Sequence, residues 1–447
     1  MGLARLEMTR RLELSRSGAF GRTEVGDLPH RGSDYVTAEL PKRYDPADIE
    51  RALYDSWESQ GHFVADPESD KPAYTIVLPP PNVTGSLHVG HALTAAVQDT
   101  LIRFKRMTGH EALWLPGTDH AGIATQMVVE RDLARRDEPG REELGREAFL
   151  EKVWDWKATN GSRIQEQHRV LGASLDWSRE RFTLDDGFSK AVAEAFVQLY
   201  EQGLLYRAER LINWSPGLKT SLSDLEVDHR DSPGSLWHLA YPVTGTDERL
   251  VVATTRPETM LGDTAVAVHP DDPRYAHLIG QTIDLPLTDR QIPIVGDAIL
   301  VDLEFGTGAV KVTPAHDFND FETGKRHDLP MINILDEGAS ISLDGPYHGL
   351  HVDEARKAVV ADLDALGLLV KIEDHAHSVG HCQRSGAVVE PRLSLQWFVS
   401  TKPMAEKAMG ATRSGETQIV PKRFEATWYH WMENIQDWCV SRQLWWG

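Results

Sequence analysis

Two histidines three residues apart form the most distinctive chemical feature of the sequence, His88-Val89-Gly90-His91. Side chains at this spacing share one face of a helix. The start of a helix attracts phosphate groups through its free N–H groups and its dipole, and Gly90 leaves space for a nucleobase to lie against the backbone. The pattern therefore predicts a nucleotide site, against the plainer alternative of two solvated or packed histidines.

The residues on either side indicate the elements that must position these histidines. The β-rich run 74–78 is stopped by three prolines at 79–81, which indicates a short buried strand. After the loop 82–86, apolar residues recur every three or four positions and predict a helix with one apolar face: Val89, Leu93, Val97, Leu101 and Phe104. A strand, a tight loop and a helix make the first unit of a doubly wound α/β sheet, whose ligands bind at the carboxyl ends of the strands.

The rest of the chain changes its pattern along the sequence. A helix is expected to begin at Asp45 or Pro46, and further helices are expected at about 142–172 and 186–203. Between about 230 and 380, short β-rich runs such as 250–254 and 298–302 alternate with turns that contain Gly and Pro. This alternation favours a separate, mainly β insertion.

Composition narrows the class of protein. The chain has 447 residues, with 47 Lys and Arg against 68 Asp and Glu, and its net charge of −21 disfavours a general nucleic-acid coat. No apolar run approaches the ~20 residues of a membrane span. Two cysteines, Cys382 and Cys439, are too few for a disulfide framework. We therefore expect a cytoplasmic globular protein without a membrane partner, and a disordered extension over residues 1–36.

Longer motifs around the two histidines resemble one enzyme family. Pro79–Ala92, which contains Pro-Pro-Pro-Asn-Val-Thr-Gly, and Leu115–Gln126, which contains Gly-Thr-Asp-His-Ala-Gly, closely resemble the valyl-tRNA synthetases of class I. The resemblance extends from about residue 41 to residue 447. It implies a Rossmann-like, parallel-sheet α/β catalytic domain of the HxGH type in residues 37–229 and 386–447, interrupted by a mainly β editing insertion in residues 230–385.

The same resemblance implies a site for ATP, accompanied by Mg2+. The residues it assigns to ATP are Pro81, Asn82, His88, Gly90 and His91. His88 and His91 would be the catalytic pair, because they would stabilise charge on the α-phosphate while valine attacks. Catalysis of this kind consists of positioning and electrostatic stabilisation.

The resemblance also implies a valine pocket made of Pro80, Asn82, Asp119 and Trp438. Asp119 would be the counter-ion of the substrate ammonium, and Trp438 would close the pocket around the side chain. Asp119 has the alternative role of a turn residue. Trp438 has the alternative role of an ordinary core tryptophan.

A second, hydrolytic site is expected because an apolar pocket rejects threonine poorly, a limit for which the valyl-tRNA synthetases are the known example. Two segments resemble the editing insertion of the family, 253–259 and 306–320. Asp320 would bind the ammonium of a misattached threonine, and Asp317 with Thr313 would read its hydroxyl. The terminal adenosine and the ester would be lined by Arg256, Thr259, Phe305 and Lys311. Hydrolysis by a positioned water is then the expected chemistry.

Plainer alternatives exist for these residues. Asp317 suits the cap of a helix, and Lys311 suits a solvated strand position. His316, Asp317 and Asp320 could also form a metal cluster, although the editing site of this family holds no metal. We therefore expect no metal there.

The sequence departs from the family in two respects. The zinc-type cysteine pairs that some relatives carry are absent, since Ser215 and Leu218 stand where thiolates would be needed and Cys382 has no partner cysteine. We expect no structural zinc, with His377, His381 and Cys382 as a weak alternative ligand set. The Lys-Met-Ser-Lys-Ser loop of the family does not occur, so we expect the catalytic domain to stop before that loop.

The expected function is ATP-dependent charging of tRNA(Val) with valine, combined with hydrolysis of Thr-tRNA(Val). The expected partners are tRNA(Val), valine and ATP, and the complete enzyme of the family is expected to be a monomer. Two alternatives follow from the missing loop: the chain is only an esterase acting on Thr-tRNA, or it is a fragment that binds tRNA without catalysis.

Overall fold

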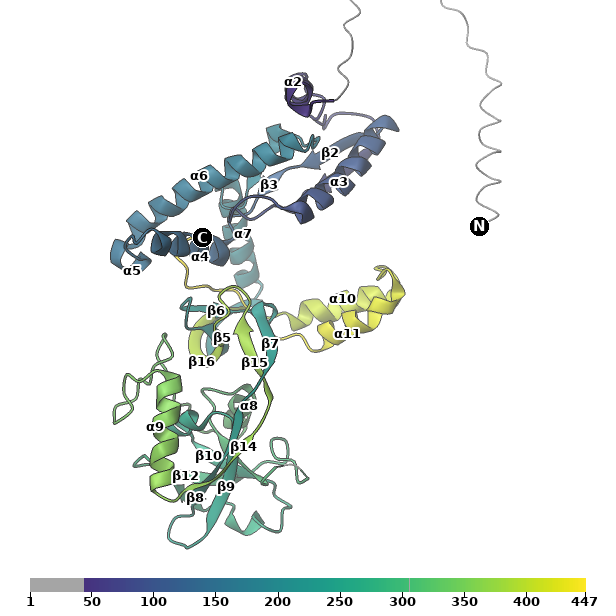
Figure 1. Ribbon diagram of the computed structural model, residues 1–447. Coiled ribbons are helices and arrows are strands. Elements are labelled where there is room, and N and C mark those ends of the chain that lie inside the picture. Colours follow the sequence, from purple (N-terminus) through teal and green to yellow (C-terminus); the bar gives the residue numbers. More distant parts are fainter. Residues whose placement is uncertain (1–43, 305) are drawn as a thin grey trace, which may run out of the picture. The chain divides into compact units, whose positions relative to one another are not determined.

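The computed structural model describes residues 44–304 and 306–447 (Figure 1). The chain divides into two units, Met1–Ile49 and Glu50–Gly447, and the second contains the sites discussed below. The expected extension over residues 1–36 and the candidate editing residue Phe305 lie outside the described residues.

The part of the chain before residue 205 alternates helices and strands. The strands are β1 (Ala73–Val77), β2 (Glu111–Leu115), β3 (Gly117–Thr118) and β4 (Arg181–Phe182). The helices are α2 (Pro46–Ser59), α3 (Val89–Met107), α4 (Gly122–Arg135), α5 (Arg141–Leu144), α6 (Arg146–Val170) and α7 (Asp186–Glu201). β1 pairs in parallel with β2, and β3 pairs in parallel with β4. These elements confirm the predicted strand at 74–78, which is β1, the helix starting at Pro46, and the helices predicted at 142–172 and 186–203.

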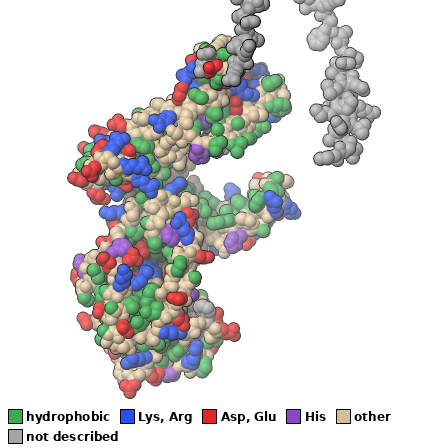
Figure 2. Space-filling model, in the orientation of Figure 1, with side chains coloured by type: hydrophobic (Ala, Val, Ile, Leu, Met, Phe, Trp, Pro, Cys, Tyr) green, Lys and Arg blue, Asp and Glu red, His purple; other side chains and the backbone are tan. Residues whose placement is uncertain are grey.

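The apolar face predicted for α3 does not form a core. Its five residues are exposed, from 44% for Leu101 to 85% for Val89, and Figure 2 shows hydrophobic side chains on the surface over this helix. Ala95 and Ile102 are buried instead, in the core cluster that includes Trp114 of β2. Polar residues share this buried side because each has a partner: the Trp114 indole donates to Gln98 at 3.0 Å.

An antiparallel sheet follows, with the strand order β17-β16-β5-β6. Its strands are β5 (Leu205–Ser215), β6 (Thr220–Leu222), β16 (Glu390–Val399) and β17 (Trp438–Cys439). A separate pair joins β7 (Val227–Ser232) to β15 (His377–Cys382) in antiparallel register. After β16 come α10 (Lys402–Ser414) and α11 (Glu425–Glu433). β5 and β16 pair residue by residue from Leu205–Val399 to Trp214–Glu390.

The chain between β7 and β15 forms short strands and two helices around the largest core cluster. β8 (Ser235–Pro242) pairs with β9 (Arg249–Thr254) and β14 (Leu369–Asp374). β10 (Ala265–Val268) pairs with β12 (Gln291–Gly296) and β13 (Ala309–Val312), and β11 (Thr282–Asp284) pairs with β12. The helices are α8 (Phe318–Arg326) and α9 (Val352–Ala365). The predicted mainly β character is confirmed for these residues, and the strand predicted at 250–254 is β9.

The strand predicted at 298–302 is wrong. These residues form a turn, because the carboxylate of Asp297 accepts hydrogen bonds from the backbone N–H groups of Ile299 and Leu300, each at 2.9 Å. A side chain that captures two successive N–H groups competes with the pairing of a strand. Apolar composition alone does not reveal such a turn.

None of the helices in residues 44–304 and 306–447 carries an apolar stretch long enough to cross a membrane.

Candidate functional site

The two histidines of the predicted nucleotide site cap the start of α3. His88 precedes the helix, and its Nδ1 accepts a hydrogen bond from the N–H of Gly90 at 3.1 Å. His91 Nδ1 accepts in return from the N–H of His88 at 3.3 Å. The ring centroids lie 4.0 Å apart. Burial and the neighbouring His88 lower the pKa of His91. Because Nδ1 accepts a hydrogen bond, the proton of the neutral ring is on Nε2.

Helix α6 holds the loop that leads into this cap. Gln167 accepts from the N–H of Leu87 at 2.8 Å and donates to the carbonyl of Leu87 at 3.3 Å. The Trp156 indole donates to the carbonyl of Val83 at 2.9 Å. Loop 82–88 is therefore fixed from a helix some 70–80 residues further along the chain. Gln167 was missed by the sequence reasoning, and no motif marks it.

The residues near β1 and β2 that are proposed to bind valine lie close together. The N–H of Asp119 donates to the carbonyl of Pro81 at 2.8 Å, and the N–H of Val83 donates to the carbonyl of Asp119 at 3.0 Å. These bonds extend the parallel pairing of β1 and β2, so Pro81, Asn82 and Asp119 meet beyond the carboxyl ends of the two strands. Pro80, directly before them, is exposed.

One oxygen of the Asp119 carboxylate is used in a turn, as the plainer alternative had it. Oδ1 accepts from the N–H of Ala121 at 2.9 Å and from the hydroxyl of Thr183 at 3.0 Å. Oδ2 accepts no hydrogen bond within residues 44–304 and 306–447. The half-buried Asp119 thus has a fixed orientation and an oxygen for a cation.

Trp438, the fourth residue proposed for the valine pocket, makes no hydrogen bond to the other three within residues 44–304 and 306–447. It belongs to β17 opposite Val399, with 55% of its surface exposed. No hydrogen bond or ring contact in the described part of the chain joins it to Asn82 or Asp119. The tryptophan that contacts this region is Trp446, which is buried and donates to the carbonyl of His120, the residue after Asp119, at 2.8 Å. The sequence reasoning missed Trp446, although the pair Trp445-Trp446 could have pointed to it.

The predicted editing residues of the insertion form a buried network around Lys311. Its ammonium donates to the hydroxyl of Thr259 at 2.9 Å, to Asp263 at 3.1 Å and to the hydroxyl of Thr313. The Thr313 hydroxyl donates to Asp263 at 2.6 Å. Lys311 is 8% exposed, so the alternative of a solvated strand position is wrong.

Asp263 is the anion of this network, and the sequence reasoning missed it. Its carboxylate is fully buried and also accepts from the Tyr241 hydroxyl at 2.8 Å. Burial raises the pKa of Asp263, against the opposing effect of Lys311. A signal was present, because Asp263 follows the predicted segment 253–259 by four residues, directly after a glycine.

Asp317 and Asp320 have different environments. Asp317 is exposed and caps α8, accepting from the N–H groups of Asn319 at 2.8 Å and Asp320 at 3.1 Å. Asp320 is 7% exposed and accepts from the N–H of Thr313 at 2.8 Å. Burial, reinforced by the charge of Asp317, raises the pKa of Asp320 to about 7. Asp320 is therefore a carboxyl group that changes charge near neutral pH.

Arg256 is enclosed by carboxylates. Its Nε donates to Glu258 at 3.2 Å, and its Nη2 donates to Glu390 of β16. Arg356 of α9 holds the same Glu258 through two hydrogen bonds, at 2.7 and 2.9 Å. Burial opposes the charge of Arg256, but Glu390 and Glu258 outweigh it and raise the pKa of the guanidinium. Arg256 is thus a fixed, fully charged group.

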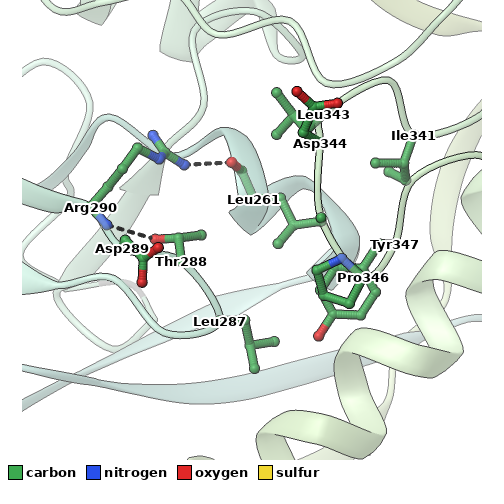
Figure 3. A pocket seen from close by; sticks show the side chains of 11 residues that line it. Leu261, Leu287, Thr288, Asp289, Arg290, Ile341, Leu343, Asp344, Pro346 and Tyr347 are labelled. Carbon is green, nitrogen blue, oxygen red and sulfur yellow. Dashed lines mark hydrogen bonds between the residues drawn. The ribbon is translucent and has the colours of Figure 1, made fainter.

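A hollow lies on the insertion beside this network (Figure 3). It is lined by Leu261, Leu287, Arg290 and the loop 341–347. Arg290 reaches from it to the carbonyls of Asp263, at 2.8 Å, and Leu261. The hollow therefore borders the backbone that carries Asp263, and of the predicted editing residues that the structure describes, none lines it.

The weak zinc alternative does not form a ligand set. His377 and His381 each direct Nδ1 to a nearby carbonyl, of His375 at 3.2 Å and of Val379 at 3.0 Å. Cys382 is buried among Leu222 and Val389. Within the described ranges, no group of three or more His, Cys, Asp or Glu residues is arranged to hold a metal ion, and this includes His316, Asp317 and Asp320.

Comparison with known proteins defines the class first. The family model of the class I tRNA synthetases (I, L, M and V) matches residues 52–447, and the chain belongs to this family. The resemblance seen at Pro79–Ala92 is therefore confirmed, as is the α/β fold class.

Two curated relatives narrow the class to the valine–tRNA ligases. The chain is 61% identical over 411 residues to the valine–tRNA ligase of Geobacter sulfurreducens, covering 92% of this chain and 46% of that protein. It is 60% identical over 410 residues to the valine–tRNA ligase of Syntrophotalea carbinolica, covering 92% and 45%. The chain thus spans about half the length of the curated relatives it matches.

Among solved structures, a LeuRS from Agrobacterium radiobacter K84 in a ternary complex with tRNA and LeuAMS is 18% identical, with a TM-score of 0.37. That match covers 78% of this chain and 52% of the LeuRS chain.

Proposed function

We propose that this chain carries the amino-acid activation site of a valine–tRNA ligase. The observation that supports the proposal most directly is the unit formed by β1, loop 78–88 and α3, with two histidines at the helix start and Asp119 beside the loop. The 61% identity to a valine–tRNA ligase supports valine as the amino acid. The reaction would use ATP with Mg2+ and would transfer valine to tRNA(Val).

Each side chain then has a defined task. Asp119 offers Oδ2 to the valine ammonium, while Pro80 and Asn82 border the same end of the strands. His91 presents its Nε2–H to the phosphates once Nδ1 is engaged by the N–H of His88. Gly90 keeps the first turn open for the nucleobase. For Trp438 to close the pocket, substrate binding would have to move it, because its ring is 55% exposed and no hydrogen bond joins it to Asp119 in the described part of the chain.

We further propose that the part between about residues 230 and 385 clears threonine from tRNA(Val). Asp320 would bind the threonyl ammonium, Asp317 and Thr313 would read the hydroxyl, and Phe305 with Arg256 would contact the terminal adenosine. Lys311 acts indirectly in this scheme, since its ammonium is engaged by Asp263 and Thr259 inside the network. A water held between Asp320 and the ester would perform the hydrolysis.

Two assays on the 447-residue chain test these proposals separately. Valine-dependent exchange between ATP and pyrophosphate, with isoleucine as control, tests activation. Release of threonine from Thr-tRNA(Val), with Val-tRNA(Val) as control, tests clearance. Clearance without exchange would support the esterase alternative, and tRNA binding without either reaction would support a non-catalytic fragment.

A further inference from the structure

Two consecutive residues at the start of β16 each bond to a different part of the proposed hydrolytic site. Glu390 accepts a hydrogen bond from Arg256 Nη2, and the carbonyl of Pro391 lies 3.1 Å from His316 Nδ1. Arg256 and His316 come from separate segments of the insertion. β16 itself lies outside the insertion and pairs with β5 along its whole length. The antiparallel sheet and the hydrolytic site therefore meet at these two residues.

The His316 contact is a fixed link. Its Nε2 accepts from the N–H of Ile334 at 2.9 Å, so the ring proton must be on Nδ1, which donates to Pro391. Burial lowers the pKa of His316 to about 3, which keeps the ring neutral at physiological pH. Because His316 directly precedes Asp317, the cap of α8, the backbone of β16 holds the start of the helix that carries Asp320.

The Glu390 contact completes a charge balance. Two guanidinium groups, of Arg256 and Arg356, face two carboxylates, of Glu258 and Glu390. The Glu258 side chain is fully buried and that of Glu390 is 7% exposed. Without Glu390, the surroundings of Arg256 would carry one uncompensated positive charge, and the guanidinium would lose the partner that fixes its outer nitrogen.

Arg256 is in turn connected to the catalytic carboxyl. Its carbonyl accepts from the Thr259 hydroxyl at 2.9 Å, and Thr259 accepts from Lys311. Lys311 contacts Thr313, whose N–H donates to Asp320 at 2.8 Å. Four hydrogen bonds therefore connect the backbone of Arg256 to the carboxylate of Asp320.

We propose that Glu390 is a positioning residue for the hydrolytic site: from the first position of β16 it sets the guanidinium of Arg256 for the terminal adenosine of the tRNA. This inference rests on the clearance activity proposed above. The antiparallel sheet β17-β16-β5-β6 would then contribute to editing, because its strand β16 supplies the residue that positions Arg256.

The test compares hydrolysis of Thr-tRNA(Val) by the full chain and by Glu390→Gln, Glu390→Asp and Glu209→Gln. Glu209 is the matched control, because it is an exposed glutamate on the neighbouring strand β5. Glu390→Gln is expected to lower kcat/KM about 10- to 100-fold, mainly through KM. Glu390→Asp should recover part of this loss, and Glu209→Gln should leave kcat/KM within about twofold of the wild type.

A double variant separates positioning from general damage. In a chain that already carries Arg256→Gln, adding Glu390→Gln should lower kcat/KM by less than about twofold, because a residue acting through Arg256 has no effect once Arg256 is lost. A full additional loss would overturn the inference, as would wild-type hydrolysis by Glu390→Gln. Unfolding of Glu390→Gln in circular dichroism would leave the Asp variant and the double variant to decide. A wild-type chain that does not hydrolyse Thr-tRNA would overturn the clearance function itself, and this inference with it.

Discussion

The proposed nucleotide site at the start of α3 and the network around Lys311 differ in how far apart in the sequence their residues lie. At α3 the proposed site lies within four consecutive residues, both histidine rings accept hydrogen bonds from backbone N–H groups of the same turn, and the apolar stripe of the helix is exposed. Around Lys311 the polar groups come from segments near residues 241, 259, 263 and 313, and they are buried. Local motifs thus suffice to recognise the first site, whereas the second exists only through tertiary contacts.

This difference has energetic consequences. On folding, the exposed histidine cap replaces hydrogen bonds to water with hydrogen bonds within the chain, so the net gain in stability is small. Single substitutions there should therefore change activity more than stability. A buried ion pair must compensate the loss of hydration of both charges, so removal of one partner leaves an unpaired charge inside the protein. Substitutions at the start of α3 should therefore lower activity, whereas substitutions in the network around Lys311 should lower stability.

The largest expected effect is on the stability of the buried network. Asp263→Asn leaves the Lys311 ammonium without its anion, and we expect the free energy of unfolding of the insertion to fall by about 3–5 kcal/mol. Urea denaturation followed by tryptophan fluorescence measures this change. Asp364→Asn, on the exposed side of α9, is the matched control and should change stability by less than about 0.5 kcal/mol. Equal stability of both variants would show that Lys311 does not depend on Asp263.

The next largest effect is expected on valine activation, from a change at the start of α3. His91→Ala removes the proposed phosphate contact and should lower valine-dependent ATP–pyrophosphate exchange about 100-fold, with hydrolysis of Thr-tRNA unchanged. If both activities fell together, the two regions would not be independent. The thermal unfolding midpoint should stay within a few degrees, because the ring is only partly buried.

A smaller effect concerns pH at Asp320. Its pKa, raised to about 7 by burial and by Asp317, implies that the carboxylate form increases as pH rises through 7. If the ionised form binds the threonyl ammonium, kcat/KM for Thr-tRNA hydrolysis should increase about tenfold between pH 6 and pH 8. The free energy of unfolding should decrease as pH rises from about 4 to about 7. The reason is that a raised pKa in the folded state means that the native chain binds more protons than the unfolded chain in this range.

Asp320→Asn provides the control for this profile. It should abolish most of the hydrolysis and remove the increase between pH 6 and pH 8 from whatever activity is left. A profile with the same midpoint in Asp320→Asn would assign the titration to another group, such as Asp263, which interacts with Asp320 from the segment before β10.

The smallest effect is expected on the exposed side of α3. Leu93→Ser changes a residue that is 67% exposed, so stability should change by about 0.5 kcal/mol or less. Ile102→Ser, one buried residue of the same helix, should destabilise the chain by about 2–4 kcal/mol. Similar losses from the two variants would mean that the apolar stripe is covered in solution.

Much of the candidate site could be predicted because local rules determine it. The strand that ends before Pro79, the helix that begins after His88 and the cap at Asp317 all follow from short-range patterns. Other features could not be predicted, because they depend on partners far along the chain. Gln167 has no motif, and Glu390 acquires its role from Arg256, 134 residues earlier.

The sequence by itself determined the family and the β1–α3 unit, since motifs and periodicity record local geometry. It also supplied the proposed ligands for phosphate, ammonium and ester. The tertiary structure decided which side of α3 is buried, which tryptophan bonds to His120, and that Lys311 is enclosed with Asp263. The physical reason is burial. Whether a side chain has lost its water, and which distant group replaces that water, is fixed only when segments far apart in the sequence pack together.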